Sequence, residues 1–144
     1  MRYLSYRSRS EAEVRQYLRR RGFLKTAVDP AIERLHSFHY LDDEAFARSW
    51  ALARAEDRGY GRRRIDQELR SKGLGQALIQ DTLRDIFDQV DETASAKRLL
   101  AKRFKGENFK DLKTLRRAAA FLQRRGYDGK VIFELLRYPI EEDC

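Results

Sequence analysis

The chain has 144 residues, and its 31 lysines and arginines outnumber its 23 aspartates and glutamates to give a net charge of +8. No apolar run is long enough to predict a membrane-spanning helix, and the N-terminus lacks the apolar segment of a secretory signal. The single cysteine, Cys144, excludes an internal disulfide or a cysteine-based metal site. We therefore expect a soluble cytoplasmic protein, and the excess of positive charge favours an anionic partner.

Residues that favour helices dominate the chain, whereas Ile, Val and Thr make up only about a tenth of it. In chain order, helix starts are predicted at a capping box in residues 10–13, at Asp29-Pro30, at residues 42–44 and at Asp91-Glu92. No proline stands between Pro30 and Pro139 to interrupt a helix. These features predict an all-α protein built from many short helices.

Three stretches of the chain share one pattern around a glycine. They are residues 14–23, 65–74 and 118–127, centred on Gly22, Gly73 and Gly126. Apolar residues stand eight and four positions before each glycine, and one, six and ten positions after it. Positions four apart share a helix face, and a glycine can take the left-handed conformation that ends a helix in a Schellman motif. The pattern therefore predicts a helix, a glycine turn and a second helix, three times over.

A further helix is predicted before each pair, but the first copy has only residues 1–7 for it, so the first helix of that repeat is truncated. The predicted three-helix repeats are residues 1–40, 41–89 and 90–138, followed by a C-terminal tail at residues 139–144. A unit of this size is marginally stable alone, so neighbouring repeats must stack. We expect an elongated, curved array.

Basic residues cluster at the ends of these predicted helices. The candidate partner-binding residues are Arg19, Arg20, Arg21, Arg62, Arg63, Arg64, Arg70, Lys72, Arg124 and Arg125. Most precede a glycine cap, where the helix dipole stabilises cations and folding alone can explain them. Residues 62–64 instead begin a helix, where three cations oppose the dipole and repel one another. The predicted compensation is an external phosphate or carboxylate, and the alternative is pairing with Glu56 or Asp57.

No arrangement of side chains predicts catalysis, and we expect no enzyme, no cofactor and no metal. His36 and His39 stand three apart, but no carboxylate at helical spacing completes a metal site. Trp50 and Tyr60 could stack on nucleic-acid bases, although the helical spacing of Trp50 favours a place in the core.

Several segments taken together resemble the RecX family of regulators of the RecA recombinase. They are residues 4–14, 18–23, 40–47, 61–73 and 121–127. The resemblance implies tandem three-helix repeats and a monomer that binds RecA and its nucleoprotein filament. It also implies inhibition of recombinase activity, by lying in the filament groove or by blocking filament extension, with the basic residues named above as contacts.

The sequence departs from the family pattern at two places. Family members have a longer helix ahead of residues 4–7. The third repeat carries Ala118 and Gln123 where the other repeats have a larger apolar residue and an arginine.

Two alternative functions remain open. A helix, a glycine turn and a helix also outline a helix-turn-helix that binds nucleic acid directly. The helix after Gly73 is polar rather than basic, because it carries Gln80, Asp81 and Asp85, so we favour contact with a protein filament and only weak nonspecific DNA binding. The other alternative is an adaptor for another acidic protein.

Overall fold

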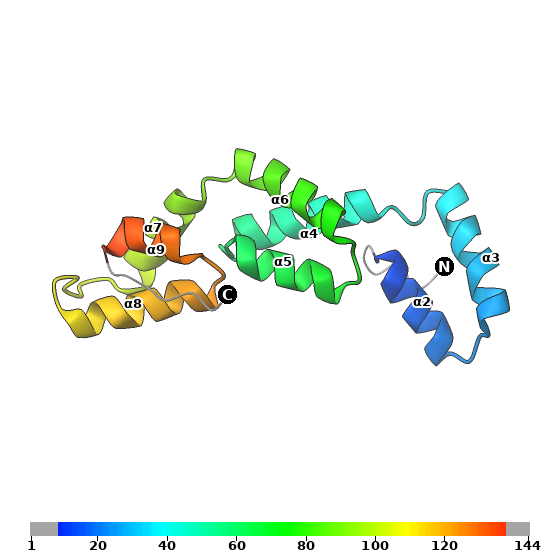
Figure 1. Cartoon of the computed structure of the whole chain (residues 1–144), viewed down its shortest axis with the longest axis horizontal. Coiled ribbons are helices and arrows are strands. Elements are labelled where there is room, and N and C mark those ends of the chain that lie inside the picture. The colour runs from blue at the N-terminus through cyan, green and yellow to red at the C-terminus, as the bar shows by residue number, and fades with distance from the viewer. Residues whose placement is uncertain (1–8, 138–144) are drawn as a thin grey trace.

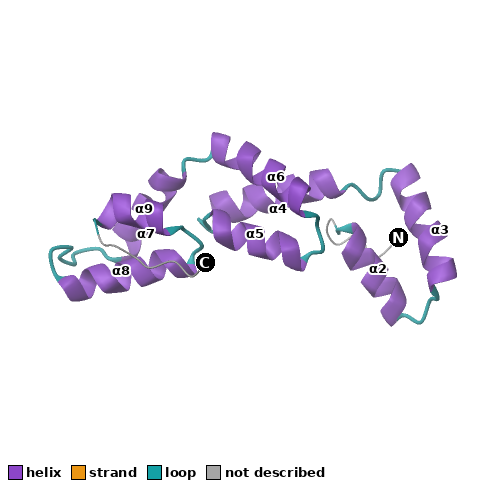
Figure 2. Ribbon diagram, viewed as in Figure 1, coloured by secondary structure: helices purple, strands orange, loops and turns teal. Residues whose placement is uncertain are grey.

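The computed structural model describes residues 9–137, and all regular structure in that range is α-helical (Figure 2). The helices are α2 (Glu11–Arg20), α3 (Lys25–Ser37), α4 (Asp43–Asp57), α5 (Arg62–Ser71), α6 (Gln76–Gln89), α7 (Glu92–Arg103), α8 (Leu112–Arg124) and α9 (Gly129–Leu136). The all-α prediction is confirmed. The predicted helix in residues 1–7, the tail at residues 139–144 and Cys144 lie outside the described residues.

The helices form an elongated, curved array of three successive groups, as predicted (Figure 1). Helices α2 and α3 form one end, α4 to α6 the middle and α7 to α9 the other end. Each group has its own small core. The first surrounds Val14 and Ile32, the second Ile65 and Ile79, and the third Leu122 and Ile132. Because each core is thin, the array needs contacts between groups to be stable.

The three glycine turns have the predicted Schellman geometry. Gly22, Gly73 and Gly126 have φ values of +91°, +82° and +96°. The amide of the residue after each glycine donates to the carbonyl five positions earlier, with distances of 3.1 Å from Phe23 to Leu18, 3.3 Å from Leu74 to Leu69 and 3.1 Å from Tyr127 to Leu122. These bonds satisfy carbonyls that the end of a helix leaves open.

The predicted helix start at Asp29-Pro30 is wrong. Helix α3 begins at Lys25, and Pro30 is its sixth residue. The Gly22 turn already directs the chain into a helix, and the Val28 amide donates to the Leu24 carbonyl at 3.0 Å. Asp29 instead joins α3 to α2, because its Oδ1 lies 2.6 Å from Nη1 of Arg15. Because Pro30 has no N–H, α3 lacks one backbone hydrogen bond at this point. The contact between Asp29 and Arg15 and the buried face of α3 hold the helix in place.

Helices α8, α5 and α2, each of which ends at one of the three glycine turns, follow one another in a row along the array (Figure 1). The C-terminal turn of α8 meets the N-terminus of α5, where the Gly61 amide donates to the Arg125 carbonyl at 2.8 Å and the Arg63 amide donates to the Gly126 carbonyl at 3.0 Å. The C-terminal turn of α5 likewise meets the N-terminus of α2, where Ser10 Oγ donates to the Lys72 carbonyl at 2.7 Å. Each negative helix end therefore faces a positive one.

Candidate partner-binding surface

A basic groove lies where α5 meets the C-terminal turn of α8. Four arginines line it, together with Asp66, Gln67, Gln123 and Gly126, around a volume of about 510 Å³. The arginines are Arg63, Arg64, Arg70 and Arg124. The tertiary structure thus brings together four predicted contact residues from two repeats, with a single carboxylate among them. A guanidinium can bind a carboxylate or phosphate through two parallel hydrogen bonds, so the groove suits an anionic partner.

Two of the groove arginines are held by internal contacts. Arg64 Nε lies 3.5 Å from Glu68 Oε2, its guanidinium stacks over the Tyr60 ring at 4.2 Å, and its Nη1 donates to the Arg124 carbonyl at 3.3 Å. Arg70 Nε lies 3.0 Å from Asp66 Oδ1. Arg124 is exposed, and no carboxylate of residues 9–137 forms an ion pair with it. The groove therefore keeps an excess of positive charge.

Two of the three arginines in residues 62–64 have carboxylate partners within the protein, as the alternative prediction allowed, although the partners are not the predicted ones. Glu92 of α7 accepts a hydrogen bond from the Arg62 amide at 3.2 Å, and its other oxygen lies 3.9 Å from Arg62 Nε. The pKa of Glu92 is raised, because the effect of burial is larger than the opposing effect of the Arg62 amide and charge. The carbonyl end of α8 faces the same turn of α5. Arg62 and Arg64 thus pair with Glu92 and Glu68 rather than with Glu56 or Asp57.

The other predicted contact residues lie outside the groove. Lys72 joins the first two groups, because its Nζ lies 3.3 Å from Glu13 Oε2 and 4.7 Å from the centre of the Trp50 ring. Arg125 stacks on Phe121 and donates to the Arg58 carbonyl at 2.9 Å. Residues 19–21 lie at the far end of the row, at the C-terminus of α2.

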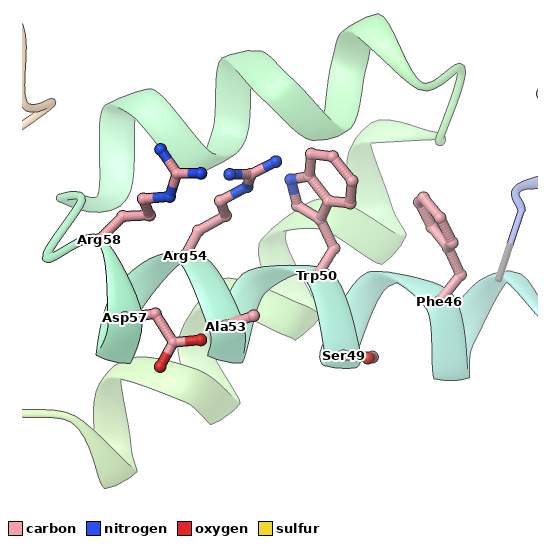
Figure 3. Close-up of a pocket in the computed structure, with 7 residues that line it drawn as sticks. All are labelled: Phe46, Ser49, Trp50, Ala53, Arg54, Asp57 and Arg58. Carbon is pink, nitrogen blue, oxygen red and sulfur yellow. The ribbon is translucent and has the colours of Figure 1, made fainter. Parts of the chain in front are cut away.

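A second basic surface, which the sequence did not single out, lies along α4. Figure 3 shows Phe46, Trp50, Arg54 and Arg58 projecting from the same side of that helix. The Arg54 guanidinium stacks on Trp50 at 4.2 Å, and both side chains contact Glu68 Oε1, at 3.0 Å from Trp50 Nε1 and 3.2 Å from Arg54 Nε. Trp50 is half-buried against the core of the middle group, so its predicted place in the core is supported.

This surface continues into the third group of helices. Asp57 and Arg58 also border a hollow of about 590 Å³ whose other lining residues are Leu99, Lys102, Arg103, Phe121 and Arg125. The four-residue spacing of Trp50, Arg54 and Arg58 is visible in the sequence and could have indicated the α4 part. The approach of α7 and α8 to Arg58 is a tertiary contact that no local pattern signals.

Neither membrane insertion nor metal binding has support within residues 9–137. None of the helices there is long and apolar enough to cross a membrane. No three His, Cys, Asp or Glu side chains in that range gather where they could hold a metal ion. His36 instead contacts Glu11, with 2.7 Å between Nε2 and Oε1, and this contact ties α3 to α2 and lowers the pKa of Glu11.

Comparison with known proteins assigns all three groups of helices to one family. Family models described as the first, second and third three-helix domains of RecX match residues 1–35, 42–83 and 90–136. This chain belongs to the RecX family. The resemblance drawn from the sequence is confirmed, and the three matches follow the order of the repeats.

Relatives in the RecX family are similar in sequence to this protein over nearly its whole length. A protein named regulatory protein RecX from Mycobacterium sp. strain KMS is 35% identical over 141 residues, which cover 94% of this chain and 76% of the relative. The protein of the same name from Streptomyces coelicolor is 31% identical, with coverage of 99% and 76%. Because these relatives are named regulatory proteins, the family is one of regulators rather than enzymes.

Two solved RecX structures resemble this chain. A crystal structure of regulatory protein RecX aligns with a TM-score of 0.76 and 27% identity, covering 94% of this chain and 66% of that longer one. The crystal structure of RecX from Lactobacillus salivarius aligns with a TM-score of 0.80, 21% identity and coverage of 94% and 88%, and it supports the fold. At the positions where the third repeat departs from the family pattern, Ala118 is buried in its core and Gln123 lines the basic groove.

Proposed function

We propose that this RecX-family protein binds the RecA recombinase and its nucleoprotein filament in the cytoplasm. It inhibits DNA-dependent ATP hydrolysis and strand exchange, by lying in the filament groove or by blocking filament extension. The observation that carries this proposal is the basic groove between α5 and α8, which gathers arginines from two repeats. A filament offers both acidic protein surface and phosphates to such a groove.

The shape of the array supports the same proposal. We propose that its repeats divide at residues 1–40, 41–89 and 90–138. The three separate cores support this division, except that Leu41 packs in the core of the first group. An elongated array can contact successive protomers of a filament at once, and each added contact raises the effective concentration of the next. Exposed basic residues stand at the α2 end of the row, at Arg20, and at the junction of α8 with α5, at Arg124, so one copy of the chain offers basic contacts at two separate places along its length.

The proposal is tested by reversing charge on both sides of the groove. In the double variant Arg70→Glu/Arg124→Glu, both positions are exposed and neither lies in a core. A matched control, Arg84→Glu/Lys97→Glu, makes the same change in net charge at exposed positions of α6 and α7. We expect the groove variant to bind the RecA filament at least about tenfold more weakly than the wild type, a loss of about 1.4 kcal/mol in binding free energy.

The readouts are filament affinity by fluorescence anisotropy and the rate of DNA-dependent ATP hydrolysis by RecA. The groove variant should lose inhibition at protein ratios where the wild type and the control variant inhibit. Equal affinities for the groove and control variants would mean that net charge, and not the groove, governs binding. Absence of inhibition by the wild type at any ratio would contradict the proposal itself.

Direct nucleic-acid binding is the second candidate, because the same arginines suit phosphates. Its test is binding to single-stranded DNA alone, to RecA alone and to the filament, over a range of salt concentrations. Binding to bare DNA as tight as binding to the filament, without any effect on RecA, would favour this alternative. Binding to none of the three would favour an adaptor for another acidic protein.

A further inference from the structure

The same glycine turn occurs three times in the row formed by α8, α5 and α2, and the array uses two of the copies as docking surfaces. The turn after α8 receives the N-terminus of α5, and the turn after α5 receives the N-terminus of α2. In both places the carbonyl of the last helical cap residue, Arg125 or Lys72, accepts a hydrogen bond from the N-cap residue of the next helix, Gly61 or Ser10.

Close approach of small residues is a second shared property of the two filled turns. A Cβ placed on Gly126 would overlap the backbone and Cβ of Arg64, and one placed on Gly73 would overlap the Cβ of Ala12. The residue that follows the glycine is buried at each filled turn, with 7% exposure for Leu74 and 1% for Tyr127. A filled turn is therefore a small apolar surface beside a carbonyl that accepts a hydrogen bond from the next helix.

The turn after α2, residues 19–24, has the same backbone, but no residue between 9 and 137 docks on it. A Cβ placed on Gly22 would have none of those residues within 4 Å, and Phe23 and Leu24 are 53% and 74% exposed. Arg19, Arg20 and Arg21 surround it, and all three are exposed. Arg21 lies over the ring of Tyr17 in its own helix, at 5.7 Å. The hydrogen bond from Arg15 is the main cause that lowers the pKa of Asp29, and the charge of Arg19 adds to it.

We propose that residues 19–24 form a docking site for the first turn of an acidic helix on the RecA partner. This inference rests on the proposed function and adds a second contact to it, at the α2 end of the row and separate from the α5–α8 groove. The occupant resembles the start of α2, with a polar N-cap like Ser10, a small residue like Ala12 and an acid like Glu13, whose carboxylate lies 3.3 Å from Lys72.

Charge selects this occupant over a second copy of the chain. The N-terminus at the other end of the row belongs to α8. Its N-cap is Asp111, and the two lysines that flank this start, Lys110 and Lys113, outnumber that single acid. Docking that helix start onto residues 19–24 would place lysines against three arginines, and like charges in contact repel. An acidic first turn instead gains from the arginines while its free amides meet the carbonyls at the end of α2.

The test compares Arg20→Glu/Arg21→Glu with the same control pair, Arg84→Glu/Lys97→Glu, for binding to the RecA filament. We expect the turn variant to bind about tenfold more weakly than the wild type, a change of about 1.4 kcal/mol, and the control within about twofold. Leu24→Ser, which leaves the charge unchanged, should weaken binding severalfold. Circular dichroism checks that each variant is folded at the assay temperature. A small loss of stability is expected for Arg20→Glu/Arg21→Glu, because acids replace cations at the C-terminal end of α2, and a small gain for Leu24→Ser, because Leu24 is the N-cap residue of α3.

Crosslinking identifies what occupies the turn. A benzophenone attached to Arg20→Cys in a Cys144→Ser background should form an adduct with RecA at a helix start that bears Asp or Glu. An adduct elsewhere on RecA, an adduct with DNA alone, or equal filament affinities for the turn and control variants would overturn the inference while leaving the groove proposal intact. Failure of the wild type to bind the filament would overturn both.

Discussion

Replacing Gly126 by alanine should damage this protein more than the same change at Gly22. Both glycines have left-handed backbones, with φ of +96° and +91°, so both substitutions carry the same conformational penalty. They differ in their surroundings, because a Cβ on Gly126 would overlap Arg64 at the start of α5, whereas one on Gly22 would meet nothing within 4 Å. The pair therefore isolates the contact between repeats from the conformation of the turn.

The magnitude follows from these contacts. A left-handed non-glycine residue costs about 1–2 kcal/mol, which is the whole expected loss for Gly22→Ala. Gly126→Ala adds about 1–3 kcal/mol for overpacking. Two hydrogen bonds of the junction, from Arg63 to the Gly126 carbonyl at 3.0 Å and from Gly61 to the Arg125 carbonyl at 2.8 Å, would also be strained. We therefore expect Gly126→Ala to lose about 2–5 kcal/mol in all.

Urea unfolding measures the difference. With a slope of about 1–3 kcal/mol per molar urea, a gap of about 2 kcal/mol separates the two midpoints by about 1 M. Far-UV circular dichroism follows all helices, and fluorescence of the single tryptophan, Trp50, follows the middle group. Earlier loss of dichroism than of fluorescence in Gly126→Ala would show the third group detaching first. Equal midpoints for the two variants would refute the idea that docking at Gly126 stabilises the array.

Three further predictions concern the junctions. Ser10→Ala removes the cap of α2 and the bond from Ser10 Oγ to the Lys72 carbonyl, and should cost about 1–2 kcal/mol in urea unfolding, whereas exposed Ser49→Ala should change little. Tyr127→Phe removes the 2.7 Å bond from the hydroxyl to the Gly59 carbonyl and should cost about 1 kcal/mol, with an unchanged dichroism spectrum as the check on fold. Because burial raises the pKa of Glu92, its contribution to stability is fully present below its unfolded pKa and is lost as pH rises through the folded value. Glu92→Gln should therefore be as stable as the wild type or more stable at pH 7, with the difference vanishing in unfolding curves recorded below about pH 4; a variant less stable at pH 7 would show that the pair with Arg62 outweighs burial.

Much of this protein is decided by local chemistry that the sequence displays. The capping box at Ser10, the caps at Asp42 and Asp91 and the three Schellman turns depend on residues within about five positions of one another, so their pattern predicts them directly. The same locality explains the repeat, because each unit uses one order of helix, glycine and helix. The error at Asp29-Pro30 arose where a contact with another helix, through Arg15, outweighed a local start signal.

Tertiary structure alone decided which basic residues meet and which are neutralised. Arg64 and Arg124 are 60 positions apart, yet they line one groove because α8 docks end to end on α5. Glu92 compensates the start of α5 from another repeat, which no spacing in the sequence reveals. The sequence determined where the helices end and which of those ends carry arginines. The stacking of repeats determined which arginines remain available to a partner, because charges interact through space and not along the chain.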